Sequence, residues 1–150
     1  MLPTQGEFVV RFVDVSGQRD QVYLHFLKIE GTAEKPIIDV QIRKDVKFHN
    51  GDPLTSADFE FSYERLRDPK ISRWSHLQAN VEKFEIVDDH HFRLHFKAPD
   101  GDYIVGSLQL WAMSKKYFEK AGEDGFANAP VGTGPWKFVS RVVKQELKLE

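Results

Sequence analysis

The feature that most constrains the fold is a strict alternation of apolar and polar side chains in residues 91–97. The apolar positions are Phe92, Leu94 and Phe96, and the polar ones are His91, Arg93, His95 and Lys97. Because successive side chains of a strand point to opposite faces, this period of two predicts a strand with one buried face. Residues 81–87 supply the other arm of an antiparallel hairpin, and Asp88-Asp89-His90 supplies its turn.

Further strands follow from the same reasoning. Ile38, Val40 and Ile42 lie on one face of a segment whose other face is polar. The chain also contains 12 Phe, 4 Tyr and 3 Trp, and aromatic residues favour strands. The remaining predicted strands cover residues 8–15, 21–28, 37–43, 136–140 and 144–149, with a loop from Gly31 to Pro36.

Helices are predicted where the period changes. Asn50-Gly51-Asp52-Pro53 indicates a turn, and Thr55 then caps a helix in which Asp58 can bond back to the cap. The apolar face of this helix is Phe59, Tyr63 and Leu66, and Asp68-Pro69 ends it. A second helix is expected from Ser114 to Ala121 with Gly122 as its stop, and a third at 103–111. The expected class is α+β, with a mostly antiparallel sheet built from hairpins and two or three packed helices in one domain, 1–150.

Composition excludes several functions. The chain has 21 Lys+Arg against 23 Asp+Glu, so it lacks the basic excess typical of nucleic-acid binders. It has no cysteine, which excludes disulfides, zinc–thiolate sites and a cysteine nucleophile. Residues 1–7 show neither the basic nor the apolar region of a signal peptide, and no apolar run is long enough to span a membrane.

Three patterns invite a catalytic or cofactor interpretation. His91 and His95 share a strand face, but Arg93 lies between them, and the sequence shows no carboxylate at a spacing suited to ligating a metal with them. A solvated face is therefore favoured over a metal site. Residues 130–135 contain two glycines but lack the Lys-Ser/Thr of a phosphate loop, which favours a turn. Asp88-Asp89 and Asp58 with Glu60 do not converge as acid–base pairs, so neither an enzyme nor a cofactor is expected.

The tryptophans are the remaining candidates for ligand contact. Trp74 lies between Arg73 and His76, after a proline-containing loop, and Trp111 precedes a polar segment. Trp136 begins a predicted strand and has a weaker claim. Aromatic side chains in such positions either pack in the core or stack on a ligand, and both readings stay open here.

Two long motifs resemble a known family. Residues 42–58, Ile-Arg-Lys-Asp-Val-Lys-Phe-His-Asn-Gly-Asp-Pro-Leu-Thr-Ser-Ala-Asp, are similar to the signature of the family 5 extracellular solute-binding proteins. Residues 61–66 and 81–96 resemble the helix and hairpin that follow it, and residues 128–138 resemble the second motif of the family. The resemblance is strong over 37–67 and 127–139, and it is weak over 1–36, where a divergent hairpin replaces the expected acidic-Trp segment.

The resemblance implies a function for a larger protein. Such receptors serve ABC importers of peptides or nickel complexes, lie in the periplasm or outside the cell, and close two lobes on their ligand. The chain resembles only the contiguous extra subdomain of the first lobe, which forms part of the cleft wall and performs no covalent chemistry. The resemblance also makes Trp74 the first candidate for ligand contact, followed by Arg73 and Trp111.

Two alternatives remain at this point. The divergence of residues 1–36 motivates a stand-alone or engineered scaffold that reuses the subdomain and binds no ligand. Such a scaffold is expected to be a monomer, whereas a concentration-dependent dimer would indicate an uncovered apolar face pairing with itself. A small hydrolase using His91 and His95 is the third and weakest hypothesis.

Overall fold

The computed structural model describes residues 6–8, 24–101, 103 and 110–150, and it has the α+β architecture expected from the sequence. A five-stranded antiparallel sheet has the order β1-β2-β3-β5-β4, and a separate two-stranded sheet pairs β6 with β7. The strands of the larger sheet are β1 (Gly6–Phe8), β2 (Leu24–Gly31), β3 (Pro36–Ile42), β4 (Val81–Asp88) and β5 (His91–Phe96). The smaller sheet consists of β6 (Phe138–Val142) and β7 (Glu146–Leu149).

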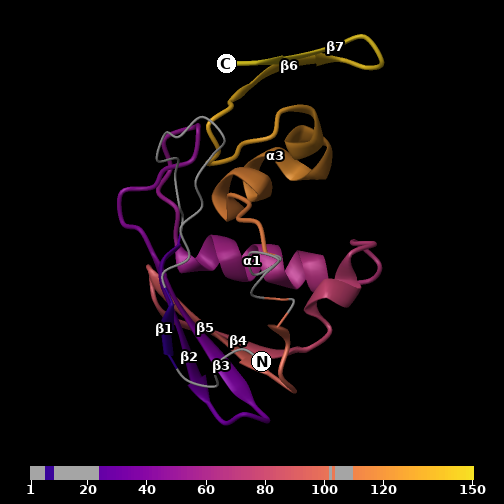
Figure 1. Cartoon of the computed structure of the whole chain (residues 1–150). Helices are drawn as coiled ribbons and strands as arrows, with labels where there is room; N and C mark the ends of the chain where they lie inside the picture. Colours follow the sequence, from indigo (N-terminus) through magenta and orange to yellow (C-terminus); the bar gives the residue numbers. More distant parts are fainter. Residues whose placement is uncertain (1–5, 9–23, 102, 104–109) are drawn as a thin grey trace.

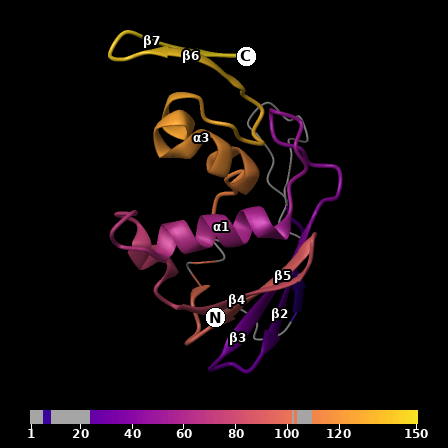
Figure 2. The ribbon, with the colours of Figure 1, turned by 180° about the vertical axis from the view of Figure 1, so that it is seen from behind.

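In the part of the chain that the structure describes, two helices and a short 3-10 turn accompany the sheets. Helix α1 (Ser56–Arg67) lies across one face of the larger sheet, α3 (Lys115–Asn128) lies on the other side of α1, and the β6–β7 hairpin lies beyond α3 (Figures 1 and 2). The 3-10 turn η1 (Ser75–Gln78) connects α1 to β4. Within the described residues, no helix is both long and apolar enough to cross a membrane.

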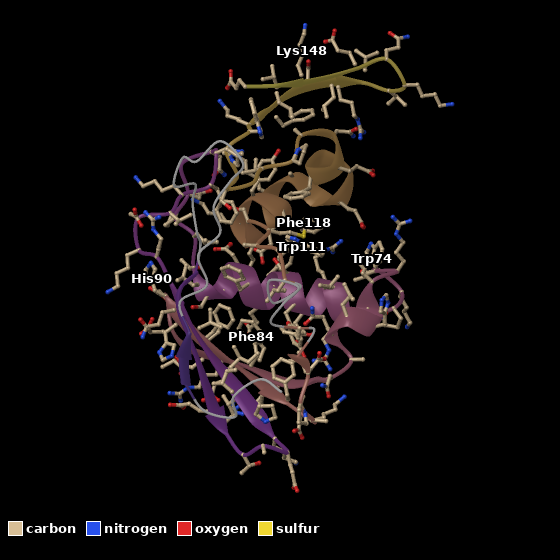
Figure 3. All side chains as sticks on the ribbon, viewed as in Figure 1. Trp74, Phe84, His90, Trp111, Phe118 and Lys148 are labelled. Carbon is tan, nitrogen blue, oxygen red and sulfur yellow. The ribbon has the colours of Figure 1, made fainter. Side chains whose placement is uncertain are left out.

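The main core lies between α1 and the sheet. Phe92 stacks on Phe84 with ring centroids 4.7 Å apart, and Phe59 of α1 lies 5.2 Å from Phe92. Tyr63, one helical turn further on, lies 5.5 Å from Phe84. Figure 3 shows Phe84 between α1 and the sheet. The predicted apolar faces of the helix and of residues 91–97 therefore meet, as their periodicities require.

Charge reinforces the register of the sheet. Paired residues on three neighbouring strands alternate in charge sign: Asp39 of β3, Arg93 of β5 and Glu85 of β4. The next row on the opposite face contains Ile29, Ile38, Leu94 and Phe84. Because a slip of one residue moves every side chain to the other face, the two rows together specify a single register.

The predictions for the starts and ends of the helices hold. The Asp58 carboxylate accepts a hydrogen bond from the Thr55 backbone N–H at 2.9 Å, as expected for the start of α1, and Asp68 caps its end. Ser114 caps α3 by accepting from the Tyr117 N–H at 3.3 Å. As predicted, the first helical segment ends at Gly122, which adopts φ 71° and ψ 179° and kinks the chain. A second helical segment, which the sequence did not predict, follows to Asn128, and its Phe126 packs 5.6 Å from Phe118.

The strand predictions also need adjustment. The strand expected at 21–28 continues to Gly31, whose positive φ of 84° lets the chain turn where a Cβ would lie 2.5 Å from the Lys35 carbonyl oxygen. The strand expected from 136 begins at Phe138. Residues 9–15, most of the first predicted strand, and 104–109, most of the third predicted helix, lie outside the described residues.

Candidate functional site

The end of α1 leads into a tight loop that presents the first two candidate residues. The Asp68 carbonyl accepts from the N–H groups of Ile71 at 3.1 Å and Ser72 at 2.8 Å. The Ser72 hydroxyl in turn accepts from the Trp74 N–H at 3.1 Å, just before η1 begins. Residues 68–74 are therefore held by their own hydrogen bonds, and they fix where Arg73 and Trp74 lie.

Arg73 and Trp74 are brought together on the surface. The guanidinium carbon of Arg73 lies 5.2 Å from the centroid of the Trp74 ring, within the range of a cation–π contact. Trp74 is nevertheless 49% exposed, and its ring centroid lies 6.0 Å from that of His76. Figure 3 shows it at the edge of the molecule, beyond the end of α1. An indole that keeps half its surface in water while paired with a cation is available to stack on a ligand.

Trp111 borders a cavity beside this loop. The side chain is 66% exposed, and the cavity next to it has a volume of about 220 Å³. The lining residues come from α1, from the loop after it and from the segment before α3: Ser62, Arg65, Leu66, Ile71, Ser72, Trp111 and Met113. Complete small-molecule sites usually enclose about 300–1,000 Å³, so this cavity is smaller than a typical complete site.

The three sequence candidates thus lie in one region but not in one contact. Trp111 lines the cavity, whereas Arg73 and Trp74 follow directly after Ser72, which lines its opposite side. Sequence reasoning missed Ile71 and Met113. Ile71 is an apolar residue in an otherwise polar loop, which was a usable signal in the sequence, and its side chain is 50% exposed in the structure. No local feature of the sequence marked Met113.

Buried polar groups of α1 position the Trp111 segment. The Ser62 hydroxyl accepts a hydrogen bond from the Met113 N–H at 2.7 Å and donates to the Asp58 carbonyl at 2.7 Å. The second oxygen of the Asp58 carboxylate accepts from the Lys115 N–H at 2.9 Å. Asp58 therefore stabilises the start of both helices, and its role is structural.

Arg65 of α1 connects α1 to α3. Its guanidinium carbon lies 4.2 Å from the centroid of Phe118 and its Nη2 lies 3.2 Å from a Glu123 carboxylate oxygen. Figure 3 shows Phe118 on the side of α1 away from the sheet. Because the Arg65 guanidinium already has the Glu123 carboxylate and the Phe118 ring as partners, its role beside the cavity is to hold α1 and α3 together.

A second cavity, of about 310 Å³, lies between the starts of α1 and α3. Two of its carboxylates already have partners: Lys116 bonds to Asp52 and thereby lowers the pKa of that carboxyl, and Asp58 accepts from the Thr55 and Lys115 N–H groups. None of the three residues singled out from the sequence lines it.

The histidine prediction requires a correction. The sequence suggested that no carboxylate lies in register with His91 and His95, but neighbouring strands supply one to each. His91 Nε2 lies 2.8 Å from Asp39, which is only 6% exposed, and Arg93 donates to the same carboxylate at 2.8 Å. His95 Nε2 lies 2.6 Å from Glu85, and this hydrogen bond lowers the pKa of the Glu85 carboxyl. The face is therefore a network of hydrogen bonds that includes the Arg93–Asp39 ion pair, rather than a set of freely solvated side chains.

The arrangement of this network in the described residues explains how its side chains pair. In the described part of the chain, no group of three or more His, Asp or Glu side chains is placed to hold a metal ion. Asp88, one of the carboxylates weighed as an acid–base pair, accepts from the His90 N–H at 2.7 Å within the hairpin turn. Each histidine faces one carboxylate, and Arg93 separates the two pairs.

The glycine-containing loop contacts the first sequence motif instead of presenting its N–H groups to a ligand. The His49 N–H donates to the Gly132 carbonyl at 2.9 Å, and His49 Nε2 lies 2.7 Å from the Gly134 carbonyl. Thr133 between them is buried. The loop thus acts as a turn that joins α3 to β6, as its sequence favoured.

Comparison with known proteins points to one family. Residues 32–150 match the bacterial extracellular solute-binding proteins, family 5 Middle. The oligopeptide-binding protein AppA of Bacillus subtilis is 33% identical over 126 residues, which are 75% of this chain and 22% of AppA. The periplasmic oligopeptide-binding protein OppA of Haemophilus influenzae is 29% identical over 143 residues, 81% of this chain and 26% of OppA.

A solved structure confirms the fold. NikZ from Campylobacter jejuni, in complex with Ni(L-His), superposes with a TM-score of 0.77 at 22% identity, over 93% of this chain and 28% of NikZ. The fold is that of periplasmic binding proteins of type II. The chain therefore spans about a quarter of the length of the proteins it matches.

Proposed function

Because the chain belongs to the bacterial extracellular solute-binding proteins of family 5, we propose that it serves a receptor for ABC-type import of peptides or nickel complexes. Two relatives are named for oligopeptide binding, and the matching structure of NikZ holds a nickel–histidine complex. The proposed location of the whole receptor is the periplasm or the cell exterior, and its partner is the membrane permease of the importer.

Within that receptor, the chain corresponds to the extra subdomain of the first lobe and forms part of the cleft wall. Its length, about a quarter of its relatives', supports this assignment. The open 220 Å³ cavity supports it too, because a cleft excludes water from a ligand only when a second wall closes over it. Its contribution is binding without covalent chemistry.

Trp74, Arg73 and Trp111 are the proposed ligand contacts. The observation that carries this proposal is the gathering of two exposed indoles and one cation around the loop after α1. Indole faces stack on the side chains or amide planes of a peptide, and the guanidinium of Arg73 attracts a carboxylate. One wall alone offers few such contacts, so we expect weak binding by this chain.

NMR titration tests the contacts because the chain has only three indole N–H signals. Trp136 is the matched control: it is 67% exposed, like Trp111, but follows the glycine loop near the β6–β7 hairpin. A mixture of short peptides should shift the signals of Trp74 and Trp111 at about millimolar concentration and leave Trp136 unmoved. Substitution of each tryptophan by phenylalanine assigns the signals.

Other outcomes would contradict the proposal in distinct ways. Equal shifts of all three signals would mean non-specific binding, and no shift at all would favour a scaffold without ligand. Micromolar affinity in calorimetry would contradict the inference that this chain is one wall of a two-walled site.

A further inference from the structure

Asn50-Gly51 is the one asparagine–glycine pair of the sequence, and it lies in the first family motif. Because glycine has no Cβ, the backbone nitrogen of Gly51 can approach the side-chain amide of Asn50 without obstruction. The other two asparagines precede Val81 and Ala129, whose side chains hinder the same approach. Asparagine is among the thermally labile residues of proteins, and this pair is the place where the chain is most reactive in that sense.

A tight turn holds the pair. The Gly51 N–H donates to the Phe48 carbonyl at 2.8 Å, and the Phe48 N–H donates to the Asp52 carbonyl at 2.8 Å. Gly51 adopts φ 89°, which is typical of the last residue in a three-residue hairpin loop. The backbone therefore favours glycine at this position, and the reactive pair is a consequence of the turn.

The Asn50 side chain is held by Asp52. Its Oδ1 accepts from the Asp52 N–H at 3.1 Å, and its Nδ2 donates to the Asp52 carboxylate at 2.8 Å. Both ends of the amide are thus bound two residues along the chain, in the local pattern that asparagine favours in turns. The attacking atom is held as well, since the Gly51 N–H has to release the Phe48 carbonyl before the nitrogen can react.

We propose that Asn50 is a site of spontaneous deamidation and that Asp52 keeps it unreacted while the turn is closed. When the turn opens, the Gly51 nitrogen bonds to Asn50 Cγ, the Cγ–Nδ2 bond breaks, and ammonia leaves with the proton of the Gly51 N–H. The succinimide that forms takes up one water molecule and opens to aspartate or to isoaspartate. Every reacting atom belongs to Asn50, Gly51 or water, so the reaction depends on no other part of the protein.

Both products are incompatible with the closed turn. Aspartate has no amide N–H, so it places a carboxylate where Nδ2 of Asn50 lies 2.8 Å from the carboxylate of Asp52. Isoaspartate adds a carbon to the main chain inside the loop that both Phe48 bonds close. The neighbouring His49 contacts the Gly132 and Gly134 carbonyls. Deamidation therefore loosens the contact between the two family motifs.

Mass spectrometry of proteolytic peptides tests the reaction. Folded chain, and chain unfolded in urea, are incubated in the same mildly alkaline buffer, and the mass gain from exchange of an amide for an acid is followed for each asparagine. Asn50 should convert many times faster in the unfolded chain, because a reaction of the open state follows the population of that state. In urea, Asn80 and Asn128 are internal controls and should convert much more slowly than Asn50.

Two variants separate the partners of the Asp52 carboxylate. D52A removes the acceptor of Asn50 Nδ2, whereas K116A keeps that acceptor and removes its lysine partner. In the folded state, D52A should convert Asn50 about three- to tenfold faster than the parent, which is the effect of one lost hydrogen bond. K116A should stay within about twofold of the parent, because an exposed ion pair contributes little. In urea, the parent and both variants should convert at similar rates.

Several results would overturn the proposal. One is a folded parent that converts as fast as the unfolded chain, and another is an unfolded chain in which Asn50 does not convert. A folded D52A that converts no faster than K116A would show that the bond to Asp52 protects nothing. An acceleration by D52A that persists equally in urea would assign the effect to the local sequence instead of the closed turn. N50D, which mimics one product, should unfold at lower urea than the parent, and an unchanged midpoint would contradict the inferred consequence.

Discussion

The hydroxyl of Ser62 should contribute measurably to stability, and its substitution tests how the candidate cavity is built. Ser62 is 4% exposed, and its Oγ makes two hydrogen bonds of 2.7 Å, to Asp58 O and from Met113 N. Removing the acceptor of a partly buried N–H costs about 1–3 kcal/mol. Alanine returns about 0.5 kcal/mol through its higher helix propensity. We therefore expect S62A to lower the free energy of unfolding by about 1–2.5 kcal/mol.

Ser56 provides the matched control within the same helix. It is 0% exposed, and its hydroxyl oxygen has no hydrogen-bond partner in the described structure. S56A removes a buried polar group that gains nothing from folding and keeps the backbone bond from Ser56 N to Asp89 O. Its stability should stay within about 0.5 kcal/mol of the parent or rise above it.

Urea unfolding followed by circular dichroism measures the difference. With a slope of about 2 kcal/mol per molar urea, S62A should unfold at about 1 M less urea than S56A. Equal midpoints for the two variants would refute the reasoning, because they would show that the bond to Met113 adds nothing. An unchanged slope is the required control, since a changed slope would mean that the unfolded states differ.

Three further predictions use the same assay or a close relative of it. D58A should lower the free energy of unfolding by about 2–4 kcal/mol, because it leaves N–H groups at the start of both helices without their acceptor. D52A breaks an exposed ion pair and should have a much smaller effect. F92A should cost about 3–5 kcal/mol because Phe92 is 0% exposed at the centre of the core, and I86A, at a position that is 40% exposed, should cost far less; similar losses would contradict the packing. Burial raises the pKa of the Tyr103 hydroxyl, so the unfolded chain loses the hydroxyl proton before the folded chain does as the pH rises. The contribution of Tyr103 to the free energy of unfolding is therefore fully present below about pH 10 and should fall above it by about 1.4 kcal/mol per pH unit. Y103F should show a shallower fall in thermal melts at alkaline pH.

Local periodicity accounts for the parts of the fold that sequence predicted well. The strand predicted at residues 91–97 and helix α1 depend on residues only a few positions apart. The strand follows from the alternation of apolar and polar side chains, and the helix follows from its cap and its apolar face. Ser114 was identified as a cap for the same reason. Gly122 was identified as a helix stop in the same way, whereas the helical segment after it was missed, because Phe126 and Phe118 meet only in the folded chain.

The polar face of the sheet shows what the sequence could not supply. His91 and Asp39 are 52 residues apart, so no motif spacing relates them, and the prediction of a solvated face followed from reading one strand alone. The candidate site has the same character. Trp74 and Trp111 stood out as residues, but the cavity depends on Ser62 reaching Met113, 51 positions further on.

The two sequence motifs of the family resemblance are also one structural unit. His49 in the first motif bonds through its backbone N–H and its ring to the Gly132 and Gly134 carbonyls of the second, across 85 positions for the ring contact. The carbonyl oxygens of Gly132 and Gly134 accept hydrogen bonds from His49. The glycines therefore let the two chain segments approach closely, and they do not form an anion-binding loop. This contact fixes the end of α3 and the start of β6 against the turn that precedes α1. The motifs therefore hold this part of the fold together, while the proposed ligand contacts, the exposed Trp74 and Trp111, lie outside both motifs.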